Sequence, residues 1–411
     1  METGVRTSRP GRPGLRALLT AVLSAALTAA PVAGCATAPA PPSSTASATS
    51  ASTTSPSSTA SPNGTSGGTS GGTSSPGPSG TTTATPRPPS TTPARPSTSG
   101  TPGPSTAPAV RAGQPAWVAV SVATLWRSPS SPRAVDAPAL RAPADVRAWL
   151  AGMTLTDRRG LQGRAETQSL LGDRLLVTAV SGTWASVVAP DQPTPKDSRG
   201  YPGWVPVRQL SAVAPRSGSQ AATVVARTAW LRGDDAAGAR VVEVSFGTRL
   251  PVLGTAGGLV RVALPGGVVR RVDPAAVVRT TTSGRALPGT GASVVASAQA
   301  FTGLPYLWAG RSGFGFDCSG LTSLVYRVHG VRIPRDADAQ ALAGRRVAST
   351  SMAPGDLLFY ATSSGYVHHV SMYAGSDLMV QSPATGQSVQ TIPVATPAYA
   401  VQLAGVRRYL S

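Results

Sequence analysis

A long low-complexity stretch limits where this chain can fold. Residues 36–113 consist almost entirely of Ser, Thr, Pro, Gly and Ala, without apolar periodicity. Such a composition cannot bury enough apolar surface to offset the entropy of folding, so we expect a disordered linker. A flexible coil of this length has ends roughly 50 Å apart and would act as a spacer. We therefore expect folded structure only from Gln114 onward.

The N-terminus has the pattern of a targeting segment. Arginines at positions 6, 9, 12 and 16 precede an Ala-rich apolar stretch at 17–30 that is short for a membrane span. Residues 32–35, Val-Ala-Gly-Cys, resemble the bacterial lipobox. This resemblance implies a signal peptide at 1–35, lipidation of Cys35, and an exported protein anchored on the extracytoplasmic side of a membrane. The competing interpretation is an ordinary signal peptide with an incidental cysteine.

The charge balance is strongly basic. Lys and Arg number 36 against 17 Asp and Glu, a formal net charge of +19, and Lys196 is the single lysine. A basic exported protein is attracted to anionic wall polymers and acidic lipid headgroups. We expect no nucleic-acid partner, because the arginines are scattered without a basic helix or an aromatic-interleaved patch.

Two β-rich segments follow the linker. The first, residues 114–216, contains short runs of β-branched and aromatic residues separated by turn signals. The second, residues 217–282, repeats parts of the first. The matching segments are 122–127 with 225–232, and 172–177 with 247–252. We expect two small β-barrels, the first enlarged by a helical insertion at about 146–161. Both segments resemble bacterial SH3 domains.

The C-terminal segment, residues 283–411, has a different pattern. Apolar residues at helical spacing predict helices near 294–301 and 321–328. Strands are expected after them, at 356–360, 369–374, 378–381 and 388–392. Helices followed by an antiparallel sheet indicate an α+β domain. The predicted chain is therefore multidomain: a disordered linker, two SH3-like β-barrels and an α+β domain.

Cys318 is the candidate nucleophile. The chain has two cysteines, so if Cys35 is lipidated Cys318 has no partner, and an unpaired thiol in an oxidising compartment is a liability unless it is used. Cys318 follows a glycine-rich loop and begins a predicted helix, where backbone N–H groups and the helix dipole favour a thiolate. The same N–H groups would stabilise an oxyanion. A buried structural cysteine is the competing interpretation.

The general base has three histidine candidates. His329 lies about 16 Å along the predicted helix from Cys318 and is excluded by that distance. His368 and His369 begin a predicted strand, in which successive side chains face opposite ways, so only one of them can meet Cys318. We choose His369.

The C-terminal motifs resemble the NlpC-type family of papain-like cell-wall peptidases. They are Asp-Cys-Ser-Gly-Leu at 317–321, Pro-Gly-Asp-Leu-Leu-Phe at 354–359 and His-Val-Ser-Met-Tyr-Ala-Gly at 369–375. The resemblance implies hydrolysis of peptidoglycan stem peptides between γ-D-glutamate and a diamino acid. It makes Cys318 the nucleophile and His369 the base and later general acid.

The same resemblance assigns the neighbouring side chains. Tyr306 supplies a hydroxyl near the oxyanion, and Asp317 and Ser319, which flank the nucleophile, belong to the substrate site. The third catalytic residue is usually a histidine in this family, but the matching position here is Gln381. A glutamine carbonyl can still accept the imidazole N–H, so the orienting role survives without added charge. The competing interpretation of Gln381 is an ordinary polar strand residue.

Two SH3-like domains before such a catalytic domain resemble a narrower group, which trims free stem peptides with an unblocked N-terminal L-alanine. The positions that match its amine-binding residues are Glu166, Tyr201 and Asp336, with Asp173 as an alternative to Glu166. Two carboxylates and a phenol would surround an ammonium group and reject acylated stems. Surface exposure of Glu166 and core packing of Tyr201 remain the alternatives.

Three rival functions share these features. The chain could be an endopeptidase on intact peptidoglycan with wall-binding SH3-like modules, a non-catalytic wall-binding lipoprotein, or a papain-like amidase or acyltransferase. Retention of Cys318 and His369 argues against loss of catalysis. No metal or cofactor is expected, because His, Cys and Asp do not cluster at ligand spacing. We expect a monomer.

Overall fold

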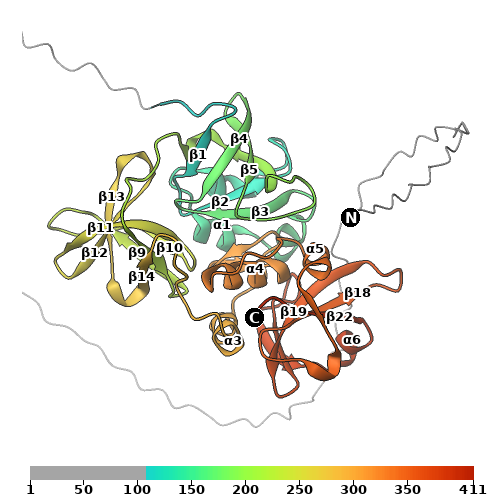
Figure 1. Ribbon diagram of the computed structural model, residues 1–411. Coiled ribbons are helices and arrows are strands. Elements are labelled where there is room, and N and C mark those ends of the chain that lie inside the picture. Colours follow the sequence, from blue (N-terminus) through green and yellow to red (C-terminus); the bar gives the residue numbers. More distant parts are fainter. Residues whose placement is uncertain (1–107) are drawn as a thin grey trace, which may run out of the picture.

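The computed structural model describes residues 108–411 (Figure 1). The predicted signal peptide, Cys35 and nearly all of the predicted linker lie outside the described residues. Within residues 108–411, no helix is both long enough and apolar enough to cross a membrane. The described chain forms two seven-stranded antiparallel sheets followed by a mixed helix-and-sheet domain.

The first sheet has the strand order β3-β2-β6-β5-β4-β1-β7. Its strands are β1 (Pro115–Val118), β2 (Val122–Trp126), β3 (Ala165–Leu170), β4 (Arg174–Ser181), β5 (Trp184–Ala189), β6 (Tyr201–Pro206) and β7 (Leu210–Ser211). Alternating apolar residues of these strands fill its interior, for example Leu125, Leu175 and Val187, all fully buried. Two short helices, α1 (Val146–Gly152) and α2 (Leu155–Arg159), lie in the predicted insertion between β2 and β3.

The second sheet repeats this strand order, as β10-β9-β13-β12-β11-β8-β14. Its strands are β8 (Gln220–Val224), β9 (Thr228–Arg232), β10 (Arg240–Ser245), β11 (Arg249–Ala256), β12 (Leu259–Ala263), β13 (Val269–Val272) and β14 (Val277–Thr281). The sequence repeat has a structural counterpart: Gly172 and Gly247 each precede the fourth strand of their sheet with φ of 86° and 81°. Glycine is favoured at both positions because this backbone region strains other residues.

The C-terminal domain has the predicted α+β order. It contains α3 (Gly291–Gln299), β15 (Arg311–Ser312), β16 (Gly315–Phe316), α4 (Cys318–Val328), α5 (Ala337–Leu342), β17 (Arg345–Val347), β18 (Leu357–Ala361), β19 (Val367–Gly375), β20 (Leu378–Gln381), β21 (Gln390–Pro393), α6 (Pro397–Ala400) and β22 (Leu403–Arg408). The main sheet has the order β17-β22-β18-β19-β20-β21.

The expectation of four strands in this domain was incomplete. The sequence analysis missed β17 and β22, and β22 pairs between β17 and β18. Both missed strands have exposed or half-buried residues at most positions, so neither carries a clear apolar alternation. Their pairing joins segments far apart in the chain, which local patterns do not reveal.

Helix α4 is the element on which the three parts of the molecule meet (Figure 1). Nearly all of its residues are buried. A run of aromatic contacts leads to it from the second sheet: the Phe246 and Phe301 rings lie 5.3 Å apart, and the Phe301 and Phe316 rings 4.8 Å apart. From the first sheet, Asp173 pairs with Arg327 of α4 at 2.5 Å. The position of Cys318 is therefore set by all three parts.

Candidate active site

Cys318 is the first residue of α4 and is buried. Asp317 forms the N-cap, and its Oδ1 accepts the Gly320 N–H at 2.6 Å. A side chain at Gly320 could not fit, because its Cβ would lie 2.0 Å from the Gly310 carbonyl oxygen. The Asp-Cys-Ser-Gly sequence thus caps the helix and lets the preceding loop pack against it, which places the thiol at the helix N-terminus.

Arg335 stabilises the start of this helix. Its guanidinium binds both oxygens of Asp317, at 2.7 and 3.1 Å, and the Ser319 hydroxyl at 2.9 Å. Its Nε also donates to Thr167 of the first sheet at 2.8 Å. Burial raises the pKa of Asp317 to about 6 against the opposing effect of Arg335, so the carboxylate is ionised at neutral pH. The Asp317 oxygens are therefore occupied by the protein itself, although the residue lines the pocket.

His369 and Gln381 form a direct pair between β19 and β20. The His369 Nε2 lies 2.6 Å from the Gln381 Oε1, and both side chains are buried. Because that oxygen can only accept, the network assigns the proton to Nε2 and leaves Nδ1 with a lone pair. The Tyr360 and Tyr399 rings lie 5.4 and 5.6 Å from the imidazole and restrict its rotation.

Tyr399 packs against this pair. The pKa of Tyr399 is raised chiefly by burial, against the opposing effect of a hydrogen bond with Gln381, and the charge on Cys318 raises it further. Because Tyr399 also packs on the His369 ring, this one aromatic side chain contacts both His369 and Gln381. No sequence motif pointed to Tyr399.

The other two histidines have different partners. The His368 Nε2 lies 2.7 Å from Gln402 Oε1, and His368 is a pocket-lining residue beside its neighbour His369. His329 ends α4, where its Nδ1 lies 2.5 Å from the Pro288 carbonyl oxygen and its Nε2 2.9 Å from the Ser297 hydroxyl. Burial lowers the pKa of His329. His329 is thus held at the end of the helix opposite to Cys318.

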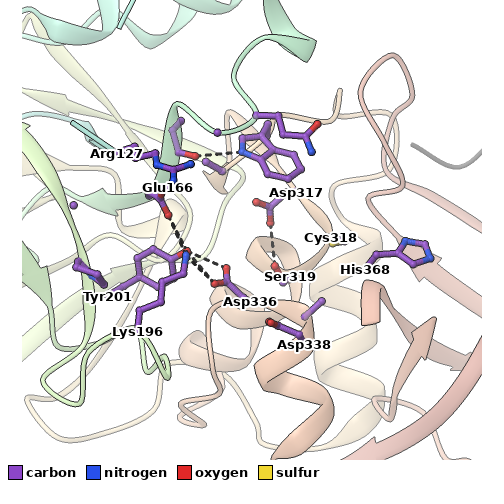
Figure 2. A pocket seen from close by; sticks show the side chains of 18 of the residues that line it. Arg127, Glu166, Lys196, Tyr201, Asp317, Cys318, Ser319, Asp336, Asp338 and His368 are labelled. Carbon is purple, nitrogen blue, oxygen red and sulfur yellow. Dashed lines mark hydrogen bonds and ion pairs between the residues drawn. The ribbon is translucent and has the colours of Figure 1, made fainter. Parts of the chain in front are cut away.

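A pocket of about 470 Å³ is lined by Cys318 and lies between the first sheet and the C-terminal domain (Figure 2). Tyr306, Trp308 and Ser319 line it close to the nucleophile. The Trp308 indole donates to the Ala165 carbonyl of β3 at 3.2 Å, so the first sheet fixes this wall. The volume is typical of a site for a small ligand or short peptide.

An acidic cluster lies in the pocket at the side of the first sheet (Figure 2). The Tyr201 hydroxyl donates to Asp336 Oδ2 at 2.9 Å and lies 3.4 Å from Glu166 Oε2. Burial, and then Asp336, raises the pKa of Tyr201 well above its ordinary value, so the phenol is neutral. The structure thus brings together Glu166, Tyr201 and Asp336, which are far apart in sequence. We refer to these three residues as the acidic cluster.

The alternative carboxylate, Asp173, lies elsewhere. It accepts the Leu170 backbone N–H at 2.8 Å and pairs with Arg327. Two residues of the pocket region were missed by the sequence analysis. Lys196 binds the acidic cluster and was noted only as the single lysine, and Arg335 stands directly before Asp336 in the chain. In residues 108–411, no group of three or more His, Cys, Asp and Glu side chains is placed to hold a metal ion.

Comparison with known proteins identifies the C-terminal domain. Residues 303–408 match the NlpC/P60 family, and residues 224–277 match the YKFC SH3b2 domain. A γ-D-glutamyl-L-lysine dipeptidyl-peptidase of Bacillus cereus is 39% identical over 302 residues, which cover 72% of this chain and 91% of that protein. The protein of the same name from Bacillus subtilis is 38% identical, over 71% of this chain and 97% of that one.

The chain belongs to the NlpC/P60 family. A crystal structure of an NlpC/P60 family protein from Bacillus cereus superposes with a TM-score of 0.69 at 37% identity, over 72% of this chain and 100% of that one. The prediction of an NlpC-type cysteine peptidase is confirmed, and so is an SH3-type domain before it. This NlpC/P60 chain is a cysteine-type peptidase of the class that hydrolyses peptidoglycan.

Proposed function

We propose that this peptidase hydrolyses the bond between γ-D-glutamate and the diamino acid in free peptidoglycan stem peptides that begin with an unblocked L-alanine. The observation that carries the proposal is the acidic cluster, which lies in one pocket with Cys318. An ammonium group already binds there, because Lys196 Nζ lies 3.0 Å from Glu166 and 3.3 Å from Asp336. The site therefore has the charge and shape for a primary amine.

The proposed chemistry is acyl transfer through a thioester. The Cys318 thiolate attacks the scissile carbonyl, while backbone N–H groups at the start of α4 and the Tyr306 hydroxyl stabilise the oxyanion. The tetrahedral intermediate collapses with cleavage of the C–N bond, and protonated His369 gives its proton to the leaving amine. His369 then takes a proton from water, whose oxygen attacks the thioester and releases the acid. Gln381 holds the imidazole in the required tautomer.

Selectivity for a free amino terminus would follow from charge. A protonated amine pairs with Glu166 and Asp336, whereas an acylated stem has no charge and two fewer N–H groups to donate. A site built to pair a buried polar group rejects the analogue that lacks the partner, because its own groups are then left unpaired. The relatives from both Bacillus species are named as peptidases of γ-D-glutamyl-L-lysine bonds, which supports the choice of bond.

We also propose that the first sheet is an SH3-like domain whose role is to close one end of the cleft. The support is its strand order, which matches that of the second sheet, where the family match falls. A wall-binding role for both domains is the alternative, and it corresponds to an endopeptidase acting on intact peptidoglycan.

The test is mass spectrometry of the products from three substrates: free L-Ala-γ-D-Glu-diamino acid tripeptide, its N-acetylated form, and intact sacculi. We expect release of L-Ala-γ-D-Glu from the free tripeptide, at least about tenfold slower cleavage of the acetylated form, and little release from sacculi. The Cys318→Ala variant gives the background. Equal cleavage of free and acetylated peptides, or preferred release from sacculi, would refute the amine requirement and favour the endopeptidase on intact wall.

For localisation, we propose an exported monomer held at the extracytoplasmic face of a membrane by lipid on Cys35. The support is the Val-Ala-Gly-Cys sequence and the low-complexity stretch after it, which would span the distance from membrane to wall. Cys35→Ser should move the protein out of the membrane fraction. Unchanged fractionation, together with an unmodified N-terminal peptide in mass spectrometry, would contradict the anchor.

A further inference from the structure

We infer that the Lys196 ammonium occupies the subsite for the substrate's amino terminus, so that a substrate must displace it before binding. This inference rests on the proposed function, because it takes the acidic cluster as the amine subsite. It makes Lys196 an internal competitor that sets substrate affinity, a role which neither the family match nor the relatives' names assign.

The contacts of Lys196 carry the inference. Its Nζ lies 3.0 Å from Glu166 Oε2 and 3.3 Å from Asp336 Oδ2 and also contacts the Tyr201 hydroxyl. The same nitrogen lies 4.3 Å from the centroid of the Tyr201 ring. All three members of the acidic cluster are therefore bound to this single ammonium (Figure 2). A second ammonium cannot enter the same point while Lys196 holds it.

The side chain of Lys196 is able to leave. It is 41% exposed, and ion pairs with that degree of exposure are weak because water and salt screen them. Lys196 stands on the connection between β5 and β6, residues 190–200. This connection is fixed before the lysine, where the Arg335 N–H donates to the Pro193 carbonyl at 2.9 Å. Rotation of the lysine side chain therefore opens the cluster without moving the loop.

Removal of the cation should increase affinity for an amine. When only a fraction of the molecules has an open subsite, the apparent dissociation constant is the intrinsic one divided by that fraction. Lys196→Met keeps most of the side-chain length but cannot bind the carboxylates. We expect it to lower KM for the free tripeptide by about fivefold, to leave kcat unchanged, and to leave the acetylated peptide unaffected.

Arg199→Met is the matched control. Arg199 lies on the same connection and loses the same charge, but its guanidinium pairs with Asp197 at 2.7 Å and not with the acidic cluster. It should leave both KM values within about twofold of the wild type. A general effect of surface charge would instead appear in both variants.

Two outcomes would overturn the inference. An unchanged KM in Lys196→Met would mean that the lysine does not compete, and a raised KM would mean that it binds substrate. Calorimetric titration with L-alaninamide, in Cys318→Ala with and without Lys196→Met, decides the question even if no peptide is cleaved. Tighter binding in the double variant supports the inference, and equal or weaker binding refutes it. If the double variant binds the amine more tightly but the enzyme cleaves no peptide, then the proposed reaction is refuted and the inference about Lys196 is not.

Discussion

The two seven-stranded sheets have the same strand order but different relations to the active site. The first contributes Glu166 and Tyr201 to the pocket, whereas the pocket-lining residues among the described chain include none from β8 to β14. Both sheets bind the loop before the nucleophile with one polar side chain each. Gln168 Oε1 accepts the Ser312 hydroxyl at 2.9 Å, and Ser245 Oγ accepts the Gly313 N–H at 2.8 Å. Both sheets therefore support this loop, but only the first sheet lines the pocket.

The difference lies in the connections between strands. In the first sheet, the link from β5 to β6 runs over residues 190–200 and carries Lys196, whereas the equivalent link in the second sheet, from β12 to β13, is only 264–268. The link from β2 to β3 contains α1 and α2, and the one from β9 to β10 contains no helix. The same strand order thus serves as a scaffold or as a pocket wall according to its loops.

If both sheets only support or line the pocket, then the largest losses of activity must come from substitutions in the C-terminal domain. Cys318→Ala and His369→Ala should each lower kcat on the free tripeptide by at least about a thousandfold, because each removes one member of a unit that acts together. Circular dichroism should be unchanged in both variants. Substantial activity in a folded Cys318→Ala protein would show that Cys318 is not the nucleophile.

Gln381 should give the next largest effect. Its carbonyl fixes the His369 tautomer without adding charge, so Gln381→Ala should lower kcat by about a hundredfold and change KM little. Gln381→His should keep substantial activity, because it restores the residue that is usual in the family. A kcat and KM series on the free tripeptide measures both. Equal kcat for wild type and Gln381→Ala would show that Gln381 does not orient His369.

The sequence predicted best where the chemistry is local. The cap, the nucleophile and the first turn of α4 come from one continuous motif, so Cys318 could be placed on a helix N-terminus without a structure. The acidic cluster could be foreseen only through the family resemblance, since Glu166 and Asp336 belong to different domains. Lys196 and Tyr399 were missed because nothing in their local sequence indicates that they reach the pocket. Strand β22 was missed for the same reason, as its partners are distant in the chain.

A substitution in the first sheet should change selectivity with a moderate effect on rate. Glu166→Gln removes one charge from the acidic cluster while keeping its size. We expect KM for the free tripeptide to rise about tenfold, the equivalent of about 1.5 kcal/mol for a charge-assisted hydrogen bond. The acetylated peptide should be unaffected, so the ratio of kcat/KM between the two substrates is the measurement. An unchanged ratio would show that Glu166 is not part of the amine subsite.

The corresponding substitution in the second sheet should have the smallest effect on selectivity. Phe246 is buried, follows β10, and packs its ring against Phe301, which in turn contacts Phe316 just before the nucleophile. Phe246→Leu keeps an apolar side chain and should cost about 1 kcal/mol of stability, because the edge-to-face contact is lost and the core repacks.

Thermal unfolding and kinetics on the same Phe246→Leu preparation would complete the comparison. The melting temperature should fall by about 2 °C, while the free-to-acetylated ratio of kcat/KM stays within about twofold of the wild type, because no residue of β8 to β14 lines the described pocket. A loss of rate that is equal for both substrates would still fit a supporting role, since Phe301 and Phe316 lead to the helix that carries Cys318. A shift in the ratio comparable to that of Glu166→Gln would instead mean that the second sheet reaches the amine subsite through the core, and the division between pocket wall and scaffold would fail.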